Sequence, residues 1–235
     1  MLVEVKVALA AVQPATLEAW RAVFSDRPEV EIIEAELTAQ PHDAWVTATK
    51  RGDLEDAVRA ALGEPVERAV QALIRERFGG SLPADFAVGV PTGGTHPKHL
   101  VAASNTPRNP HGINDHMRVA LAAGAALQAV HVQNAAEPGS IRDVVLPRLG
   151  PETVSERHRA ELMWTAYELF RQAELPDGAA TRRALCDLLG GAAVKEAAAG
   201  TLKRTYRKRK TAASGKSTMP DRPSARAPLE STSED

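Results

Sequence analysis

The sequence predicts a layered α/β domain, in which one sheet is covered by helices on both faces. Short apolar runs alternate along the chain with longer segments of helical spacing, which is the pattern of such a domain. Two neighbouring runs, Ala87–Val90 and Leu100–Ala103, contain no charged residue and are bounded by Pro and Gly. Uninterrupted apolar runs of this length are typical of strands that are buried on both faces of a sheet.

The same patterns give the order of the elements. They predict strands at Val3–Leu9, Val30–Leu37, Ala44–Thr49, Ala87–Val90, Leu100–Ala103 and Asp143–Leu146. They predict helices that begin near Pro14 and at Asp53, and helices at Val66–Phe78, Ile113–Val132 and Ser155–Ala173. Pro14 suits a first helical turn, and Asp53 is expected to be the N-cap residue of its helix.

The composition limits the class of protein. The chain has 235 residues, of which 43% are hydrophobic and only 4% aromatic, so its core must consist of Ala, Val and Leu. The single cysteine, Cys186, belongs to no CxxC pair, and no apolar run has the length of a membrane span. The start of the chain lacks the pattern of a signal peptide. We therefore expect a soluble, cytoplasmic protein without membrane partners.

Charge and composition divide the chain into three parts. We expect an α/β domain over residues 1–175, a helical extension over 176–202 and a disordered tail over 203–235. From Thr201 onward there are nine basic and four acidic residues, a net charge of +5, whereas residues 1–200 have 20 basic and 26 acidic residues, a net charge of −6. The body is therefore not expected to attract nucleic acid over its whole surface.

The tail contains one dense basic run. Lys203–Lys210 has six basic residues in eight, with Tyr206 among them. Such a run can bind nucleic acid through its phosphates, or it can be a solvated tail that only improves solubility. The sequence leaves both interpretations open.

The loop between the two central strands suggests a ligand crevice. Pro91-Thr92-Gly93-Gly94-Thr95 follows a buried strand, and a Gly pair there lets backbone N–H groups approach an anion closely. The alternative is an ordinary β-turn.

Several strings resemble the macro domain, a family that binds ADP-ribose. Glu34–Leu37 followed by Asp43–Val46 is similar to the family's "GD-I…DA-V-N" stretch, and Leu82–Gly93 is similar to its "LP-x-G-x-A-x-x-T-x-G" stretch. His99–Ala103 stands where the family has "I-H-x-V", and Ile141–Gly150 resembles "S-I-A-x-P-x-L-G-T-G". The resemblance spans about residues 3–172 and implies a three-layer, mixed-sheet domain.

The resemblance also implies roles for particular residues. Glu36 stands where the family has an Asp that accepts a hydrogen bond from the adenine amino group. The resemblance implies that two segments line the diphosphate from opposite sides. These are Thr92, Gly93 and Gly94 on one side, and Leu149 and Gly150 on the other. Their backbone N–H groups would supply fixed dipoles to the phosphates.

The chain departs from the family pattern in both phosphate loops. Lys50 replaces the Asn after the third strand, and the Gly-rich loop of hydrolytic members is largely missing. In the second loop, Pro151 removes a backbone donor and Glu152 adds a negative charge. These departures favour a protein that holds its ligand without cleaving it.

Two further groups of residues are candidates for the site. Lys50 and Asp53 would carry catalysis in a hydrolytic member, with Lys50 as nucleophile and Asp53 orienting a water or the distal ribose; the alternative is a solvated strand-to-helix turn. Arg108 and Asn109 follow the fifth strand and are suited to phosphate, or they are an exposed loop pair.

No metal or cofactor is expected. His96, His99, His111 and His116 fall close together, but their spacings match no zinc pattern. Three functions therefore remain open. The first is a binder of ADP-ribose or a related nucleotide diphosphate. The second is an ADP-ribosyl hydrolase, and the third is a scaffold that binds nucleic acid or a protein through its tail.

Overall fold

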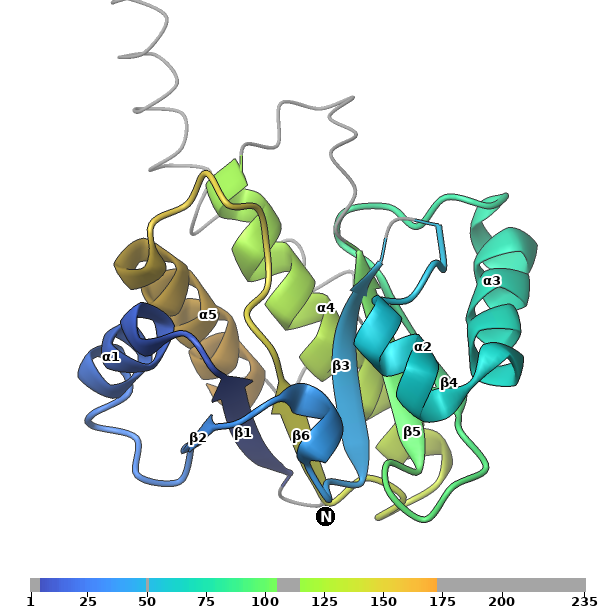
Figure 1. The fold of residues 1–235 in the computed structure, drawn as a ribbon, viewed down its shortest axis with the longest axis horizontal. Coiled ribbons are helices and arrows are strands. Elements are labelled where there is room, and N and C mark those ends of the chain that lie inside the picture. Colours follow the sequence, from blue (N-terminus) through green and yellow to red (C-terminus); the bar gives the residue numbers. More distant parts are fainter. Residues whose placement is uncertain (1–4, 50, 105–114, 173–235) are drawn as a thin grey trace, which may run out of the picture. The chain divides into compact units, whose positions relative to one another are not determined.

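The computed structural model describes residues 5–49, 51–104 and 115–172 (Figure 1). The strands are β1 (Lys6–Ala11), β2 (Glu31–Glu34), β3 (Ala44–Thr49), β4 (Ala87–Pro91), β5 (His99–Ser104) and β6 (Asp143–Leu146). The helices are α1 (Pro14–Val23), α2 (Asp56–Leu62), α3 (Glu64–Phe78), α4 (Asp115–Ala136) and α5 (Glu156–Gln172), with a 3₁₀ turn η1 at Leu37–Ala39. None of the helices in these ranges is long and apolar enough to cross a bilayer.

The strands form one mixed sheet in the order β2-β1-β6-β3-β5-β4. β1 pairs in parallel with β2 and β6, and β3 pairs in parallel with β6 and β5. Only the edge strand β4 runs antiparallel, as the hairpin partner of β5. The carboxyl ends of the first five strands in this order therefore meet at one edge of the sheet, while β4 begins at that edge and ends at the other.

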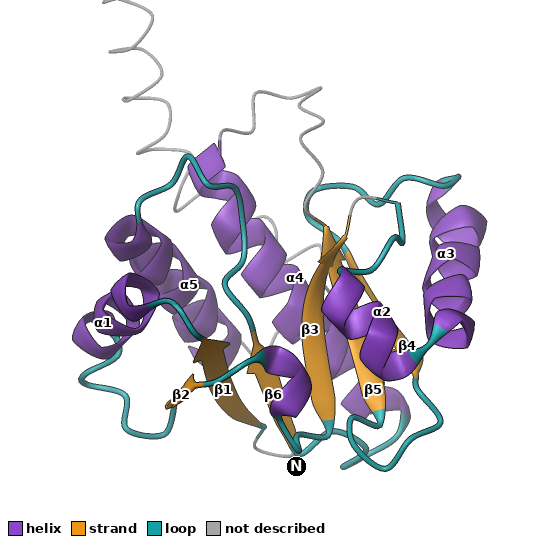
Figure 2. Ribbon diagram, viewed as in Figure 1, coloured by secondary structure: helices purple, strands orange, loops and turns teal. Residues whose placement is uncertain are grey.

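Helices cover both faces of the sheet, as the sequence predicted (Figure 2). The residues of β1 alternate between two cores: Val7, Leu9 and Ala11 pack with α1, α4 and α5, and Ala8 and Ala10 pack with α2 and α3. Both faces of each central strand are thus buried, and this explains why these strands appear in the sequence as continuous apolar runs.

Most predicted elements exist, and their ends differ by a few residues. The strands expected at Ala44–Thr49 and Asp143–Leu146 have those bounds. The strand expected at Val30–Leu37 is shorter, because the chain leaves the sheet after Glu34 and turns into η1. The extension predicted at 176–202 and the tail predicted at 203–235 lie outside the described residues.

The expectation that Asp53 caps α2 was wrong. The helix begins at Asp56, its N-cap residue is Glu55, and neither side chain caps it. Asp53 lies earlier, in a turn that the neighbouring elements hold: its backbone carbonyl accepts a hydrogen bond from Thr49 Oγ1 at 3.0 Å, and its carboxylate accepts one from Gln71 Nε2 at 3.3 Å. Asp53 is thus held in a turn by Thr49, four residues before it, and by Gln71 of α3, and the helix starts after this turn.

A buried carboxylate joins the amino ends of three central strands. The Asp43 side chain is 1% exposed and accepts hydrogen bonds from Lys98 Nζ at 2.8 Å and from the Arg142 backbone N–H at 3.0 Å. The Asp43 carbonyl accepts the N–H groups of Lys98 and His99, and its own N–H donates to Asp143 Oδ1. Burial works against the charge, but the hydrogen bonds from Lys98 and Arg142 outweigh it and hold the pKa of Asp43 below 3.8.

We expect Asp43→Asn to lower the free energy of unfolding at neutral pH by about 2–4 kcal/mol, because it weakens a buried, hydrogen-bonded charge. Since the folded pKa is depressed, the carboxylate's contribution is present above the unfolded pKa and is lost as pH falls through the folded value. The difference between the two proteins in urea unfolding should therefore shrink in acid. Asp26→Asn, at an exposed carboxylate 3.5 Å from Arg27 Nη1, is the control and should change little.

Candidate functional site

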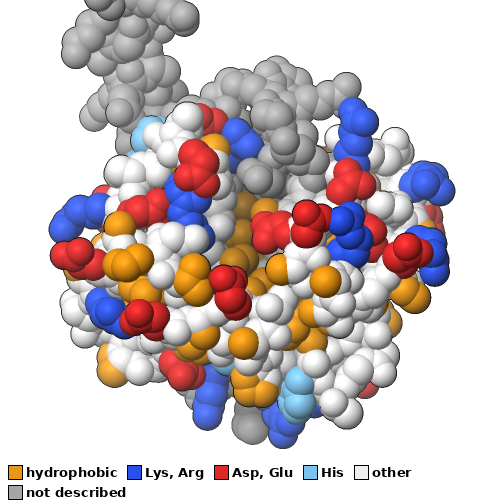
Figure 3. Space-filling model, viewed as in Figure 1, with side chains coloured by type: hydrophobic (Ala, Val, Ile, Leu, Met, Phe, Trp, Pro, Cys, Tyr) orange, Lys and Arg blue, Asp and Glu red, His pale blue; other side chains and the backbone are white. Residues whose placement is uncertain are grey.

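A pocket of about 310 Å³ lies at the carboxyl ends of β1, β3 and β6. Figure 3 shows a hollow near the middle of the molecular surface that faces the viewer, with hydrophobic side chains on its floor and acidic side chains at its margin. The pocket is lined by residues 10–13, 35–38, 48, 55, 57, 58, 147, 148, 150 and 152. It thus joins the ends of three strands, the start of α1, the turn before η1 and the loop after β6.

The topology explains the position of this opening. β1 leads into α1 on one face of the sheet, whereas β3 leads toward α2 on the other face, and β6 lies between them. The two connections leave their strands toward opposite faces, so they leave a gap above the strand ends. Ligands of open α/β sheets bind at such points.

The charged groups that the described residues bring to the pocket are mainly acidic. Glu36, Glu55 and Glu152 line it together with one guanidinium, that of Arg148. Burial raises the pKa of the Glu55 carboxyl above its ordinary value of 4.5. Glu55 is an exposed residue at the N-cap position of α2, so its carboxyl is only partly removed from solvent.

Arg148 is bound by two carboxylates of different character. Its Nε and Nη2 donate to Glu156 Oε1 at 2.9 and 2.6 Å, and its Nη1 and Nη2 donate to the two oxygens of Glu152 at 2.7 and 2.9 Å. Burial works against the charge of Arg148, but these hydrogen bonds outweigh it and raise its pKa. Glu156 also accepts the hydroxyl of Thr16, in the first turn of α1, at 2.9 Å.

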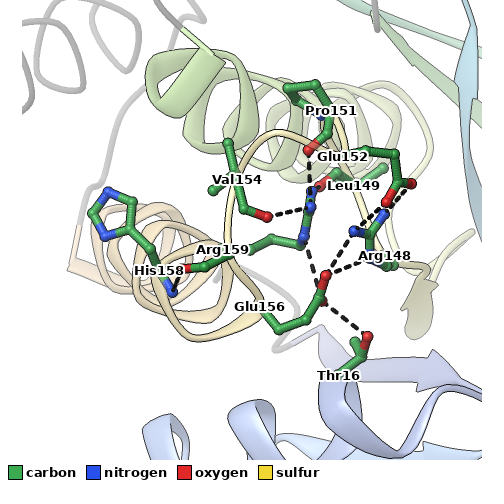
Figure 4. A network of polar contacts seen from close by, with 10 residues as sticks. Thr16, Arg148, Leu149, Pro151, Glu152, Val154, Glu156, His158 and Arg159 are labelled. Carbon is green, nitrogen blue, oxygen red and sulfur yellow. Dashed lines mark hydrogen bonds and ion pairs between the residues drawn. The ribbon is translucent and has the colours of Figure 1, made fainter.

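Arg159 holds the loop that forms one wall of the pocket (Figure 4). Its side chain is fully buried and donates to three backbone carbonyls, those of Leu149 at 2.5 Å, Pro151 at 2.9 Å and Val154 at 2.9 Å. The guanidinium also lies 3.5 Å from Glu156 Oε2. Carbonyls that turn inward would otherwise be buried without a partner, so Arg159 stabilises this shape of the loop.

The inward carbonyls fix the direction of the next N–H groups. Across a trans peptide the carbonyl of one residue and the N–H of the next point in opposite directions. Because Arg159 binds the carbonyls of Leu149 and Pro151, the N–H groups of Gly150 and Glu152 point away from the guanidinium. Both residues line the pocket. Gly150 has φ +90°, and a Cβ on it would collide with Val119, so this turn requires glycine.

Three of the predicted ligand residues meet at this pocket. Glu36 and Gly150 line it, although 114 positions separate them in the sequence. Leu149 lies directly beside it with a fully buried side chain, and its carbonyl anchors the loop to Arg159.

The predicted second diphosphate segment lies at the other end of the sheet. Thr92, Gly93 and Gly94 connect β4 to β5, and β4 is antiparallel, so its loop meets the amino ends of β3 and β5. Thr92 donates its N–H to the Lys98 carbonyl and closes the hairpin. These residues therefore do not meet Leu149 and Gly150, and the expectation that both segments line one diphosphate was wrong.

The remaining predicted residues are not part of the described pocket. Asp53 is exposed beside α3 and does not line it. Lys50, Arg108 and Asn109 lie outside the described residues, as does the basic run Lys203–Lys210. Their roles stay predictions from the sequence.

Sequence reasoning missed the groups that shape the pocket. Arg148 lies inside the string that carried the family resemblance, between Pro147 and Leu149, and its charge was the available signal. The position of Glu55 at the start of α2 was missed because Asp53, two residues earlier, was expected to be the N-cap residue. Arg159 carries no signal at all, since an Arg near a helix start is usually on the surface.

Of the comparisons with known proteins, the one with solved structures finds similar chains. No family model matches the sequence, and a search of curated proteins finds no match. Among solved structures, the macrodomain of Mycobacterium tuberculosis DarG is 14% identical, with a TM-score of 0.44 over 57% of this chain and 86% of that one. A macrodomain from Oceanobacillus iheyensis is 13% identical, with a TM-score of 0.46 over 66% of this chain and 88% of that one.

We expect Arg159→Met to lower the free energy of unfolding by about 2–4 kcal/mol, because three buried carbonyls lose their donor while the side-chain volume is kept. Backbone amides of residues 149–155 should exchange with solvent faster than in the unchanged protein, as seen by hydrogen exchange. Arg157→Met, two residues away on an exposed ion pair with Glu161, is the matched control. Unchanged exchange in the Arg159 variant would show that another contact holds the loop.

Proposed function

We propose that the pocket binds ADP-ribose or a related nucleotide diphosphate. The observation that carries this proposal is the meeting of Glu36 and the Arg159-held loop at one pocket. The family resemblance had assigned these two segments to the two ends of one ligand, the adenine and the diphosphate. The two segments are far apart in the sequence, so only the tertiary fold brings them to one pocket.

Two further features suit a phosphate in this place. The N–H groups of Gly150 and Glu152 point away from Arg159 and provide fixed dipoles beside the pocket. The first turn of α1 starts at the pocket with Gln13 as N-cap, has no side-chain cap and contains no acidic residue. Pro14 has no N–H and the N–H groups of Thr16 and Leu17 donate to the Gln13 carbonyl, so this turn contributes the positive end of the helix dipole rather than a set of free donors.

The proposal is tested by calorimetry with ADP-ribose on the full chain. Ala57→Glu places a carboxylate on an exposed position of α2 that lines the pocket, so we expect it to weaken binding at least about tenfold. Ala60→Glu makes the same change on the same helix outside the pocket lining and should bind like the unchanged protein. Equal affinities in all three proteins would place the ligand elsewhere.

An ADP-ribosyl hydrolase is the second candidate, and Glu55 favours it. A carboxyl that keeps its proton to a higher pH than usual can donate it to a leaving group, and Glu55 lines the pocket. The sequence pointed instead to Lys50 and Asp53, of which Asp53 is exposed outside the pocket lining.

For the hydrolase, we expect Glu55→Gln to lower the turnover of an ADP-ribosylated protein by about 10²–10⁴-fold, with little change in ADP-ribose affinity. Because the pKa of Glu55 is raised, the active protonated form persists above pH 4.5 and the rate should fall as pH rises through the folded pKa. The measurement is ADP-ribose release against pH. If Asp53→Asn rather than Glu55→Gln abolishes turnover, the acid is the one that the sequence suggested.

A further inference from the structure

We infer that Arg148 is the phosphate-binding side chain of the pocket, and that Glu152 is a competitor within the chain that controls its affinity. The inference rests on the proposed function, because it needs an anionic ligand in this pocket. It identifies a specificity-determining pair, in which the ligand phosphate would take the two donors that Glu152 now holds.

The two partners of Arg148 differ in how firmly they are held. Glu156 is 24% exposed, and Thr16 and Arg159 hold it from the other side. Glu152 is 87% exposed, and the structure gives its carboxylate no hydrogen-bond donor besides Arg148 among the described residues. Glu152 therefore depends on Arg148 alone, whereas Glu156 is held by three side chains and keeps Arg148 in place.

The geometry of the Arg148–Glu152 ion pair is one that a phosphate can reproduce. Glu152 binds Arg148 in a two-pronged way, at 2.7 and 2.9 Å. A phosphate presents two oxygens to a guanidinium in the same manner, so it can replace the carboxylate on Nη1 and Nη2. Arg148, Gly150 and Glu152 all line the pocket, so the guanidinium and the two outward N–H groups lie along the same wall.

In this exchange the side chain and the backbone N–H of Glu152 have different roles. The Glu152 carboxylate can turn into solvent, while its N–H stays in the loop that Arg159 holds through the Pro151 carbonyl. A residue that competes with the ligand through its side chain therefore remains a donor through its backbone. Because the carboxylate is tethered four residues from Arg148, it competes at high effective concentration and excludes weak or neutral ligands.

The test is a double-mutant cycle on the full chain, with inorganic pyrophosphate and ADP-ribose as probes in calorimetry. We expect Glu152→Gln to raise pyrophosphate affinity about two- to tenfold, because the competing charge is removed. Arg148→Lys keeps a positive charge beside Glu156 but loses the planar fork, so it should weaken binding and abolish the gain from Glu152→Gln. Glu161→Gln, at an exposed carboxylate on α5 outside the pocket lining, is the control and should leave the affinity unchanged.

The results distinguish a failure of this inference from a failure of the proposed function. An equal gain from Glu152→Gln with and without Arg148 would mean general charge repulsion and would overturn the inference. Weaker or unchanged binding in Glu152→Gln would also overturn it, and ADP-ribose binding to the unchanged chain would then leave the proposed function standing. If no variant binds either probe, both proposals fail. Thermal unfolding of each variant shows that altered binding does not reflect loss of the fold.

Discussion

The burial of Arg159 is the constraint on which the candidate site depends. A guanidinium with no exposed surface depends on the protein for its partners, and here three carbonyls of one loop accept hydrogen bonds from its Nη1 and Nη2. The loop after β6 cannot relax outward without breaking these hydrogen bonds. A single side chain of α5 thus fixes the wall of a pocket that is formed by the ends of β1, β3 and β6, and in doing so decides which backbone groups the wall presents.

Charges of alternating sign connect this buried group to the surface. Arg159 meets Glu156, Glu156 meets Arg148, and Arg148 meets the exposed Glu152. Buried ion pairs are weak contributors to stability by themselves, since desolvation offsets most of their attraction. Their effect here is positional: Thr16 adds α1 to the same chain of contacts, so α1 and α5 are held in one arrangement.

The fold could be predicted from the sequence better than the site. Runs such as Leu100–Ala103 are buried on both faces, so their apolar character alone identifies them as central strands. The direction of β4, an edge strand with Gly89 and Pro91 exposed, is not encoded in its apolar pattern, because a short apolar run does not show which way a strand runs, and the error about Gly93 followed from this. The roles of Arg159 and Glu55 depend on partners distant in sequence, which no local spacing reveals. Glu36 and Gly150 were found because a family pattern, rather than their surroundings, assigned them to one ligand.

Because β4 runs antiparallel to β5, the loop between them and the pocket lie at opposite edges of the sheet. The hairpin tip at Gly93, Gly94 and Thr95 is exposed, and it lies at the edge of the sheet opposite to the pocket. Exposed tips of small and polar residues are the positions at which proteins best accept inserted sequence. A fluorescent label or an epitope could therefore be attached at this tip, where it would report on the protein without touching the pocket.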